Sequence, residues 1–554
     1  MKKYVIGLDY GTLSGRAVLV DVSDGTVIAQ HTKQYTHGVM DKFLPDGTAL
    51  PVGWALQHPQ DYLDVLEEIV PAVMRKSGVS SEAVIGIGID FTASTVVPVD
   101  ETGVPLCLKA EFASQPHAWV KLWKHHGAGS QAERMTETAK RRGEEFLALY
   151  GGKVNAEWGM PKYLELLEGA PEIYRHTDCI MECGDWIVRI LTGEHTRSES
   201  VAGYKALWRK GEGAVSSEYL KAVNPQFEYF VKEKFGGRVV PLGTLAGRIK
   251  KEMADRLGVA AGTAVAAANI DAHAAVPSLG ICSPEKAMLV LGTSACLITC
   301  SEKKAAIPGI CGVVEDGVLP GLYGYEAGQS SVGDLFDWFV RNCVPERYER
   351  EAEERGLKVH QLLTEKASRL RPGESGLIAL DWWNGNRSCL SDSDLSGLIL
   401  GMTLATKPEE IYRALIESAA FGMRMIIDNF EQSGITIREV FVSGGIAGKN
   451  PMLMQIYADV LNRELHIGTS DQGAAVGAAI WSAVCAGSAA GGYDTVAEAA
   501  VKMGHVNRDS YKPIPENVEI YEKLFAEFRI LHDYFGKGAN DVMKRLRKIK
   551  TEVV

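Results

Sequence analysis

The chain has 554 residues, a formal net charge of −11 at pH 7, and 46% hydrophobic and 23% charged residues. A single hydrophobic core rarely extends over so long a chain, so we expect two large domains. The acidic balance gives no electrostatic reason to expect nucleic acid or an anionic membrane as a partner. No uninterrupted apolar stretch reaches the roughly 18 residues of a membrane span. The ten cysteines are scattered, which predicts free thiols and a reducing, cytoplasmic location.

The first half of the chain alternates between strand and helix patterns. In chain order, this pattern predicts a hairpin over 3–22, a helix over 58–78 and strand–turn–strand over 84–106. It then predicts helices over 157–168 and 181–193, the second closed by Gly193, and a Gly/Ala-rich crossing between the halves over 236–268. Gly86 and Gly88 resemble part of a dinucleotide fingerprint. The third glycine is missing and a strand follows, so we reject that interpretation.

The second half repeats the strand–turn–strand theme before turning helical. It predicts strand pairs over 286–299 and 309–325, a long helix over 407–433, a strand, glycine loop and helix over 438–461, and a partly basic helical end over 513–548. A solvated amphipathic face explains that basic end.

Two glycine–threonine turns are the strongest local signals. Gly11-Thr12 lies within GLDYGTLSGRAVLVD, and Gly292-Thr293 lies within MLVLGTSACLIT. Glycine allows positive φ and a close approach of ligand to backbone. The hydroxyl and the free N–H groups suit phosphate oxygens. Two such hairpins indicate two related halves that hold one polyphosphate between them.

Asp9 ends the apolar strand that precedes the first turn. A carboxylate in that place is costly unless it is paired or binds a cation. Beside a phosphate site the natural cation is Mg²⁺, bound through water. Arg16 and the second turn support this hypothesis; the alternative is an Asp that only hydrogen-bonds its own turn.

The segment Gly444–Asn450 looks like a Walker A loop but lacks its required residues. Ser443 and Asn450 stand where that motif needs Gly and Ser or Thr. We expect instead a strand-to-helix loop on which a base or ribose lies, with Gly444, Gly445 and Asn450 as contacts. The alternative is a plain tight connection.

Asp271 is the candidate general base. It follows an apolar run and precedes small residues, which suits a carboxylate at a strand end that opens a helix. His273 competes for the role, but residues i and i+2 of a helix do not share a face. We therefore expect Asp271 to serve the site and His273 to pack.

Lys205 and Glu326 are charged residues flanked by glycines and aromatics, a setting that fits contact with a polyol. The alternative for each is a surface ion pair. Other polar or aromatic groups receive no role in binding: Trp side chains usually pack in cores, and His125-His126 and the pair Asp392 and Asp394 look like loop polarity without a metal.

Together these residues resemble the FGGY carbohydrate kinases of the actin, sugar kinase and heat-shock ATPase superfamily, over roughly residues 3–490. The segment 398–422 closely matches the C-terminal signature of that family. The N-terminal signature is partial: Lys162 and Tyr163 fit, whereas Glu165 stands where Trp is usual. The resemblance implies an α/β fold of two actin-like (ribonuclease H-like) domains with a central cleft. It implies a sugar-binding domain over 1–270 and an ATP-binding domain with a helical tail over 271–554.

Within the family, several strings are similar to those of the kinases that act on L-ribulose; they are 90–100, 292–298, 324–334, 380–388 and 441–460. That resemblance implies ATP- and Mg²⁺-dependent phosphorylation of L-ribulose at O5 in arabinose catabolism. It implies that the sugar meets Ala93, Lys205, Asp271 and Glu326. A homodimer is plausible for the family.

Two other functions stay open at this point. The chain could be another kinase of the family, acting on D-ribulose, xylulose, a pentitol or glycerol. It could also be a nucleotide-driven binding protein of the superfamily. Asp271 argues against the second alternative, because a binding ATPase needs no base that faces a second substrate.

Overall fold

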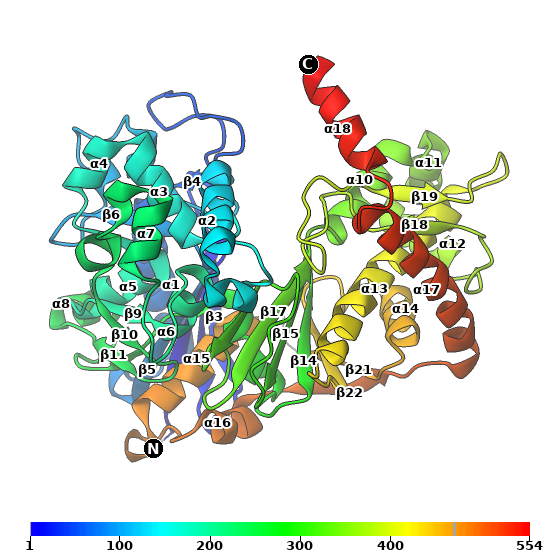
Figure 1. Cartoon of the computed structure of the whole chain (residues 1–554). Helices are drawn as coiled ribbons and strands as arrows, with labels where there is room; N and C mark the ends of the chain where they lie inside the picture. Colours follow the sequence, from blue (N-terminus) through cyan, green and yellow to red (C-terminus); the bar gives the residue numbers. More distant parts are fainter. Residues whose placement is uncertain (1, 469–471, 554) are drawn as a thin grey trace.

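Two seven-stranded sheets, each with its own helices, form the two halves of the molecule (Figure 1). The computed structural model describes residues 2–468 and 472–553. Strands β1 to β13 lie in the first half and β14 to β22 in the second. The two α/β halves that the sequence indicated are therefore present.

The first sheet contains the predicted N-terminal hairpin. Its order is β11 (Leu245–Arg248), β12 (Ala264–Ala266), β5 (Val84–Phe91), β1 (Tyr4–Tyr10), β2 (Ser14–Asp21) and β3 (Val27–Gln34), and β13 (Asn269–Ile270) pairs with the end of β5. β1 and β2 are antiparallel, with Asp9 opposite Arg16. β1 and β5 are parallel, with Asp9 opposite Asp90.

Helices cover both faces of this sheet, because the residues of β1 and β5 alternate between two apolar cores. Ile6, Leu8 and Tyr10 point into the core that also takes residues of α1 (Pro59–Ser77), α5 (Cys183–Thr192) and α8 (Lys251–Leu257). Val5 points into the core formed with α15 (Gly473–Ala486), which Figure 1 shows beside β5 and next to α16.

Glycines let α15 pack directly on the backbone of the first sheet. A Cβ on Gly7 would lie 1.8 Å from the carbonyl oxygen of Ala475, and one on Gly88 would lie 1.9 Å from that of Ala478. Gly86 likewise meets Ser482. The Gly-x-Gly string that resembled a dinucleotide fingerprint is thus a helix-packing surface.

Smaller elements extend the first half. A four-stranded sheet has the order β4 (Leu56–Gln57), β7 (Val120–Lys121), β6 (Val96–Val99), β8 (Cys179–Glu182), and a two-stranded sheet pairs β9 (Thr196–Ser198) with β10 (Arg238–Val240). The helices around them are α2 (Gly129–Arg142), α3 (Gly159–Gly169), α4 (Pro171–His176), α6 (Glu199–Lys205) and α7 (Ser217–Val223).

The second sheet contains the second predicted hairpin, β14 with β15. Its order is β16 (Gly312–Glu315), β17 (Tyr323–Gln329), β15 (Ala295–Ser301), β14 (Lys286–Leu291), β20 (Glu439–Ser443), β21 (Leu465–Gly468) and β22 (Val506–Tyr511). β18 (Ile378–Leu380) and β19 (Leu398–Leu400) form a separate pair. The remaining helices are α9 (Asp271–Ala274), α10 (Gly333–Cys343), α11 (Glu346–Glu354), α12 (Val359–Ala367), α13 (Pro408–Gln432), α14 (Pro451–Leu461), α16 (Val496–Met503), α17 (Pro515–Gly536) and α18 (Val542–Val553).

Two predictions of local structure were wrong. The segment 236–268 is no crossing between halves, because β11 and β12 within it are strands of the first sheet. The helix expected over 181–193 begins only at Cys183, since the residues before it form β8; it does end at Gly193, whose φ is +80°. Apolar runs that serve as short buried strands have the same composition as helix starts, which explains the error.

All ten cysteines are free, as predicted; five are buried, four are half-buried, and Cys343 is exposed. Among the described residues, none of the helices combines the length and the apolar character needed to cross a bilayer.

Candidate active site

Three carboxylates meet where neighbouring strands of the first sheet end. Asp9 is near the end of β1, Asp90 stands opposite it on β5, and Asp271 follows β13, which pairs with the last residues of β5. The carboxyl ends of parallel strands share one edge of a sheet, so the three side chains gather there. We call Asp9, Asp90 and Asp271 the acid edge.

Burial and mutual repulsion shape the acidity of these groups. Burial raises the pKa of Asp271 to about 7, and the charges of Asp9 and Glu326 act in the same direction. Burial also raises the pKa of Asp9, although Arg16 opposes the shift. The pKa of Asp90 lies well above its usual range because this group is buried beside Asp9 and Asp271. A carboxyl with a pKa near 7 suits general-base chemistry at neutral pH.

Cationic partners offset part of this charge. Arg16 Nε lies 3.1 Å from Asp9 Oδ2, and Arg16 Nη1 donates to Gln472 at 3.2 Å. Gln472 is the residue before α15, so the positive end of that helix dipole also lies near Asp9. Asp90 is fully buried and shares a side-chain hydrogen bond with Asp9. Carboxylate oxygens are ligands that Mg²⁺ prefers, and Asp9, 7% exposed, is more accessible than the fully buried Asp90.

The second sheet presents glycines at the matching position. β14 ends at Leu291, and β20, which pairs with it in parallel, ends at Ser443 before Gly444. Gly444 has φ +103°, and a Cβ there would lie 2.2 Å from the carbonyl oxygen of Leu291. Gly445 faces open space. We call 292–293 together with 444–450 the glycine edge.

Asn450 has a structural task within that edge. Its Oδ1 accepts a hydrogen bond from the N–H of Leu453 at 3.0 Å and so caps α14, which begins at Pro451. The strand, loop and helix expected over 438–461 are therefore present. Nucleotide contact by Asn450 stays a prediction.

The two glycine–threonine turns differ from expectation in backbone conformation. Neither Gly11 nor Gly292 adopts positive φ. Each N–H instead closes its own turn, on the carbonyl of Ser14 for Gly11 and of Ser294 for Gly292, both at 3.0 Å. A Cβ would meet no atom closer than 3.4 Å at either glycine. The glycines thus keep the turn surface open rather than relieve strain.

Lys205 and Glu326 pair with each other inside the protein. Lys205 Nζ lies 3.2 Å from Glu326 Oε2, and both side chains are buried. The surface ion pairs considered from the sequence are therefore wrong. Lys205 ends α6 of the first half and Glu326 lies on β17 of the second, so the pair joins the halves. Although burial acts in the opposite direction, Lys205 and His273 hold the pKa of Glu326 below its usual range.

His273 is buried, as predicted, but it also contacts the site. Its Nε2 lies 3.3 Å from Glu326 Oε2, and its ring meets Tyr204 edge-on at 4.5 Å between centroids. Burial lowers the pKa of His273. Its neighbour Asp271 is half-buried and lies at the start of α9. The histidine therefore orients Glu326 while the aspartate stays accessible.

Lys162 connects the loop that carries Ala93 to the first glycine–threonine turn. Its buried Nζ donates to the carbonyl oxygens of Ser94 at 2.7 Å and Leu122 at 2.8 Å. Trp123 directly follows Leu122, and its indole N–H donates to Thr12 Oγ1 at 3.0 Å. Ser94 has φ +62°, an uncommon value for a residue other than glycine and one found often at functional loops. The sequence marked Lys162 only through the family signature.

Glu165, the departure from that signature, is part of a buried charge network. It lies 2.5 Å from Lys121 Nζ and 3.0 Å from His125 Nε2. His125 is therefore a buried partner rather than loop polarity. The aspartates expected to be loop polarity also have partners, since Asp392 pairs with Lys544 and Asp394 with Arg547 of α18. A Trp at 165 would leave Lys121 without its counter-charge.

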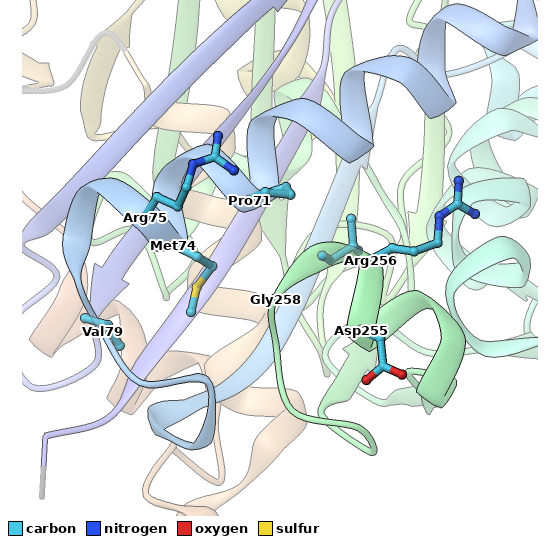
Figure 2. A pocket seen from close by; sticks show the side chains of 8 residues that line it. Pro71, Met74, Arg75, Val79, Asp255, Arg256 and Gly258 are labelled. Carbon is cyan, nitrogen blue, oxygen red and sulfur yellow. The ribbon is translucent and has the colours of Figure 1, made fainter.

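Two other features lie outside the site. A surface groove between α1 and α8 has a volume of about 340 Å³, but none of the acid-edge residues lines it (Figure 2). His37, His58 and Asp61 cluster near one another. The two imidazoles are stacked, with centroids 4.3 Å apart, and the Nδ1 of each is already hydrogen-bonded. Parallel rings cannot both direct a lone pair at one ion, so this cluster is no ready metal site.

One α/β half carries an acidic strand edge and the other a glycine-rich strand edge, an arrangement that suits a two-domain kinase. The chain belongs to the FGGY family of carbohydrate kinases, whose N-terminal domain matches residues 4–277 and whose C-terminal domain matches residues 287–486. It is a phosphotransferase of that family, and kinases of this kind use ATP.

Individual relatives agree with this assignment. The chain is 54% identical to a protein named ribulokinase from Halalkalibacterium halodurans, covering 99% of this chain and 98% of that one. It is also 54% identical to a ribulokinase from Geobacillus thermodenitrificans, covering 99% and 97%. Its fold matches the crystal structure of xylulose kinase from Rhodospirillum rubrum with a TM-score of 0.78 and 23% identity, covering 96% and 98% of the two chains.

Proposed function

We propose that this chain is an ATP-dependent ribulokinase that transfers the γ-phosphoryl group of ATP to O5 of L-ribulose. The proposal rests on the full-length similarity to ribulokinases and on one feature of the site. That feature is Asp271, a half-buried carboxyl with a pKa of about 7 beside the Lys205–Glu326 pair. A base and polar side chains for hydroxyl groups therefore lie together.

Unpartnered polar atoms around this site suit a polyhydroxylated ligand. Among the described residues, the buried atoms without a hydrogen-bond partner include Ser94 Oγ, Asn269 Nδ2 and Arg387 Nε. A buried polar group left unpaired costs about 1–3 kcal/mol. Sugar hydroxyls both donate and accept, so an open-chain pentose would supply the missing partners.

Each of these residues has a separate role in the proposed reaction. Ala93, Lys205 and Glu326 position the sugar, and Asp271 accepts the O5 proton as O5 bonds to the γ-phosphorus. The bond from that phosphorus to the β–γ bridging oxygen breaks, and ADP leaves. Most of the rate gain in such transfers comes from positioning and charge stabilisation.

The nucleotide lies, in this proposal, on the glycine edge of the domain spanning 271–554, with the sugar in the domain spanning 1–270. Gly444, Gly445 and Asn450 contact base and ribose, while Gly11, Thr12, Arg16, Gly292 and Thr293 contact phosphates. Asp9 would hold Mg²⁺ through water, and the ion would neutralise charge on the β- and γ-phosphate oxygens. A cytoplasmic location and a homodimer also stay predictions.

A substrate panel tests the proposal. The purified chain, with ATP and Mg²⁺, is assayed for ADP formation with L-ribulose, D-ribulose, D-xylulose, ribitol and glycerol, and the product is located by ³¹P–¹H NMR. We expect kcat/KM for L-ribulose to exceed the others by about tenfold or more, with phosphate on O5. A higher kcat/KM for another acceptor would show that this acceptor, and not L-ribulose, is the substrate. ADP formation that no sugar stimulates would favour a nucleotide-driven binding protein.

A further inference from the structure

Arg387 is a cation of the site to which the proposed reaction assigns no task. It lies on the loop between β18 and β19, and its Nη2 donates to Glu326 Oε1 at 3.3 Å. The other oxygen of Glu326 faces Lys205 at 3.2 Å and His273 at 3.3 Å. Three side chains from three elements thus converge on one carboxylate.

The loop places Arg387 independently of Glu326. Ser388 Oγ accepts a hydrogen bond from the N–H of Gly328 on β17 at 3.3 Å. Asn386 and Asp392 exchange two backbone hydrogen bonds of 2.8 Å. Lys153 of the first half donates to the carbonyl of Ser391 at 3.2 Å. Because both halves hold the loop, Arg387 has a fixed position at the site before any ligand arrives.

Most of the guanidinium is left without an acceptor. A guanidinium carries five N–H donors, and the Nη2–Glu326 contact is its one side-chain hydrogen bond among the described residues. The Nε is buried and unpartnered, whereas 24% of the side chain is exposed. Cys311 of the second half has the largest electrostatic effect on Arg387, and Glu157 of the first half also acts on it. The group therefore lies within electrostatic reach of both halves and has donors to spare.

We propose that Arg387 is a sugar-binding residue that donates to an oxygen of the ketose while its Nη2 orients Glu326. This inference rests on the proposed function, since the ligand it needs is the phosphoryl acceptor. The planar fork of arginine binds two acceptors at once, one on each side. A lysine at 387 could pair with Glu326 but could not also present the second donor in that geometry.

Two variants separate binding from mere positioning. Arg387→Gln removes both the positive charge and the planar guanidinium, whereas Arg387→Lys keeps the charge and removes only the planar guanidinium. We expect KM for the sugar to rise about tenfold or more in both, while KM for ATP stays within about twofold. Calorimetric titration of the sugar without ATP should show the same loss of affinity, which makes the readout independent of turnover.

Arg413→Lys is the matched control. Arg413 is a buried arginine of the second half that donates to Glu417 at 2.8 Å and to Tyr521 at 2.9 Å, within α13 and α17. Its variant should lower Tm and leave KM for the sugar unchanged. Wild-type affinity in Arg387→Lys would overturn the direct contact, and wild-type affinity in Arg387→Gln would overturn any role. The wild-type substrate panel decides the proposed function separately, and the variants are measured with whichever sugar it selects.

Discussion

In the first half the hairpin strand β1 carries Asp9 two residues before its turn glycine, whereas in the second half the strand β14 carries Val290 at that position. Each of these strands has a parallel neighbour on one side and its hairpin partner on the other. The neighbour of β1 contributes Asp90 opposite Asp9, and the neighbour of β14 contributes Ser443 opposite Val290. Equivalent positions therefore carry acids in one half and small or apolar residues in the other.

Because of this difference, the two halves share one strand arrangement but suit different chemical roles. In the proposed function the acid edge supplies Asp271 as the base and Asp9 as the carboxylate that holds the cation, and phosphoryl transfer needs both. The glycine edge has little charge, and its open surface at Gly445 and Thr293 suits the close approach of a nucleotide. α15 links the edges, because Gly473 at its start lies near Ser443 while Gln472 contacts Arg16.

Among the variants that test this comparison, loss of the proposed base should reduce kcat most. In Asp271→Asn we expect kcat to fall about 100-fold or more, because the amide cannot accept the hydroxyl proton. Steady-state ADP formation measures it. The control is Asp185→Asn: Asp185 is a buried carboxyl whose pKa burial also raises to about 7, but it lies on α5. Equal losses in both variants would mean that burial of a carboxyl, not its place on the acid edge, matters.

Asp9→Asn tests the other member of the acid edge. We expect the Mg²⁺ concentration needed for half-maximal turnover to rise about 10- to 100-fold, because the bound water loses its charged partner. Binding of Mn²⁺ in the presence of ADP, followed by electron paramagnetic resonance, should weaken in parallel. If the Mg²⁺ requirement were unaltered, Asp9 would only pair with Arg16.

The acidity of Asp271 predicts a pH profile. A base must be ionised, and burial raises the pKa of this one to about 7. The rate constant kcat/KM should therefore fall about tenfold per pH unit below that value and level off above it. The profile of Asp185→Asn should keep this acidic limb. A limb near pH 4 in the wild type would show that Asp271 is not the titrating base.

The hairpins, the long helix α13 and the strand–loop–helix of the glycine edge could be predicted from sequence because each is a local pattern. The Lys205–Glu326 pair could not, since its members are 121 residues apart and approach only when the halves pack. Asp90 looked like an ordinary residue of a strand–turn–strand, and its place beside Asp9 depends on the register of β1 with β5.

Long-range partners also explain other features that the sequence did not predict. His125 is buried because Glu165, 40 residues away, accepts from it. Gly86 and Gly88 are required by α15, which lies almost 400 residues later in the chain. Spacing within one segment carries no information on such contacts. Glycine would allow positive φ at positions 11 and 292, but each turn closes with its own hydrogen bond in another conformation, which composition does not predict.

Adjacent glycines of the glycine edge give the smallest effects and the finest test of the comparison. Gly444→Ala should lower stability by about 1–3 kcal/mol, because its φ is +103° and its Cβ would strike the carbonyl of Leu291. Gly445→Ala should leave Tm unchanged, because a Cβ there meets no atom within 4 Å. If a nucleotide lies on that open surface, Gly445→Ala should also raise KM for ATP about threefold and leave KM for the sugar unchanged. The added methyl group would obstruct the close approach of the nucleotide without disturbing the fold. Thermal unfolding and steady-state kinetics on the two variants measure both effects, and an unaltered KM for ATP in Gly445→Ala would move the nucleotide away from this loop.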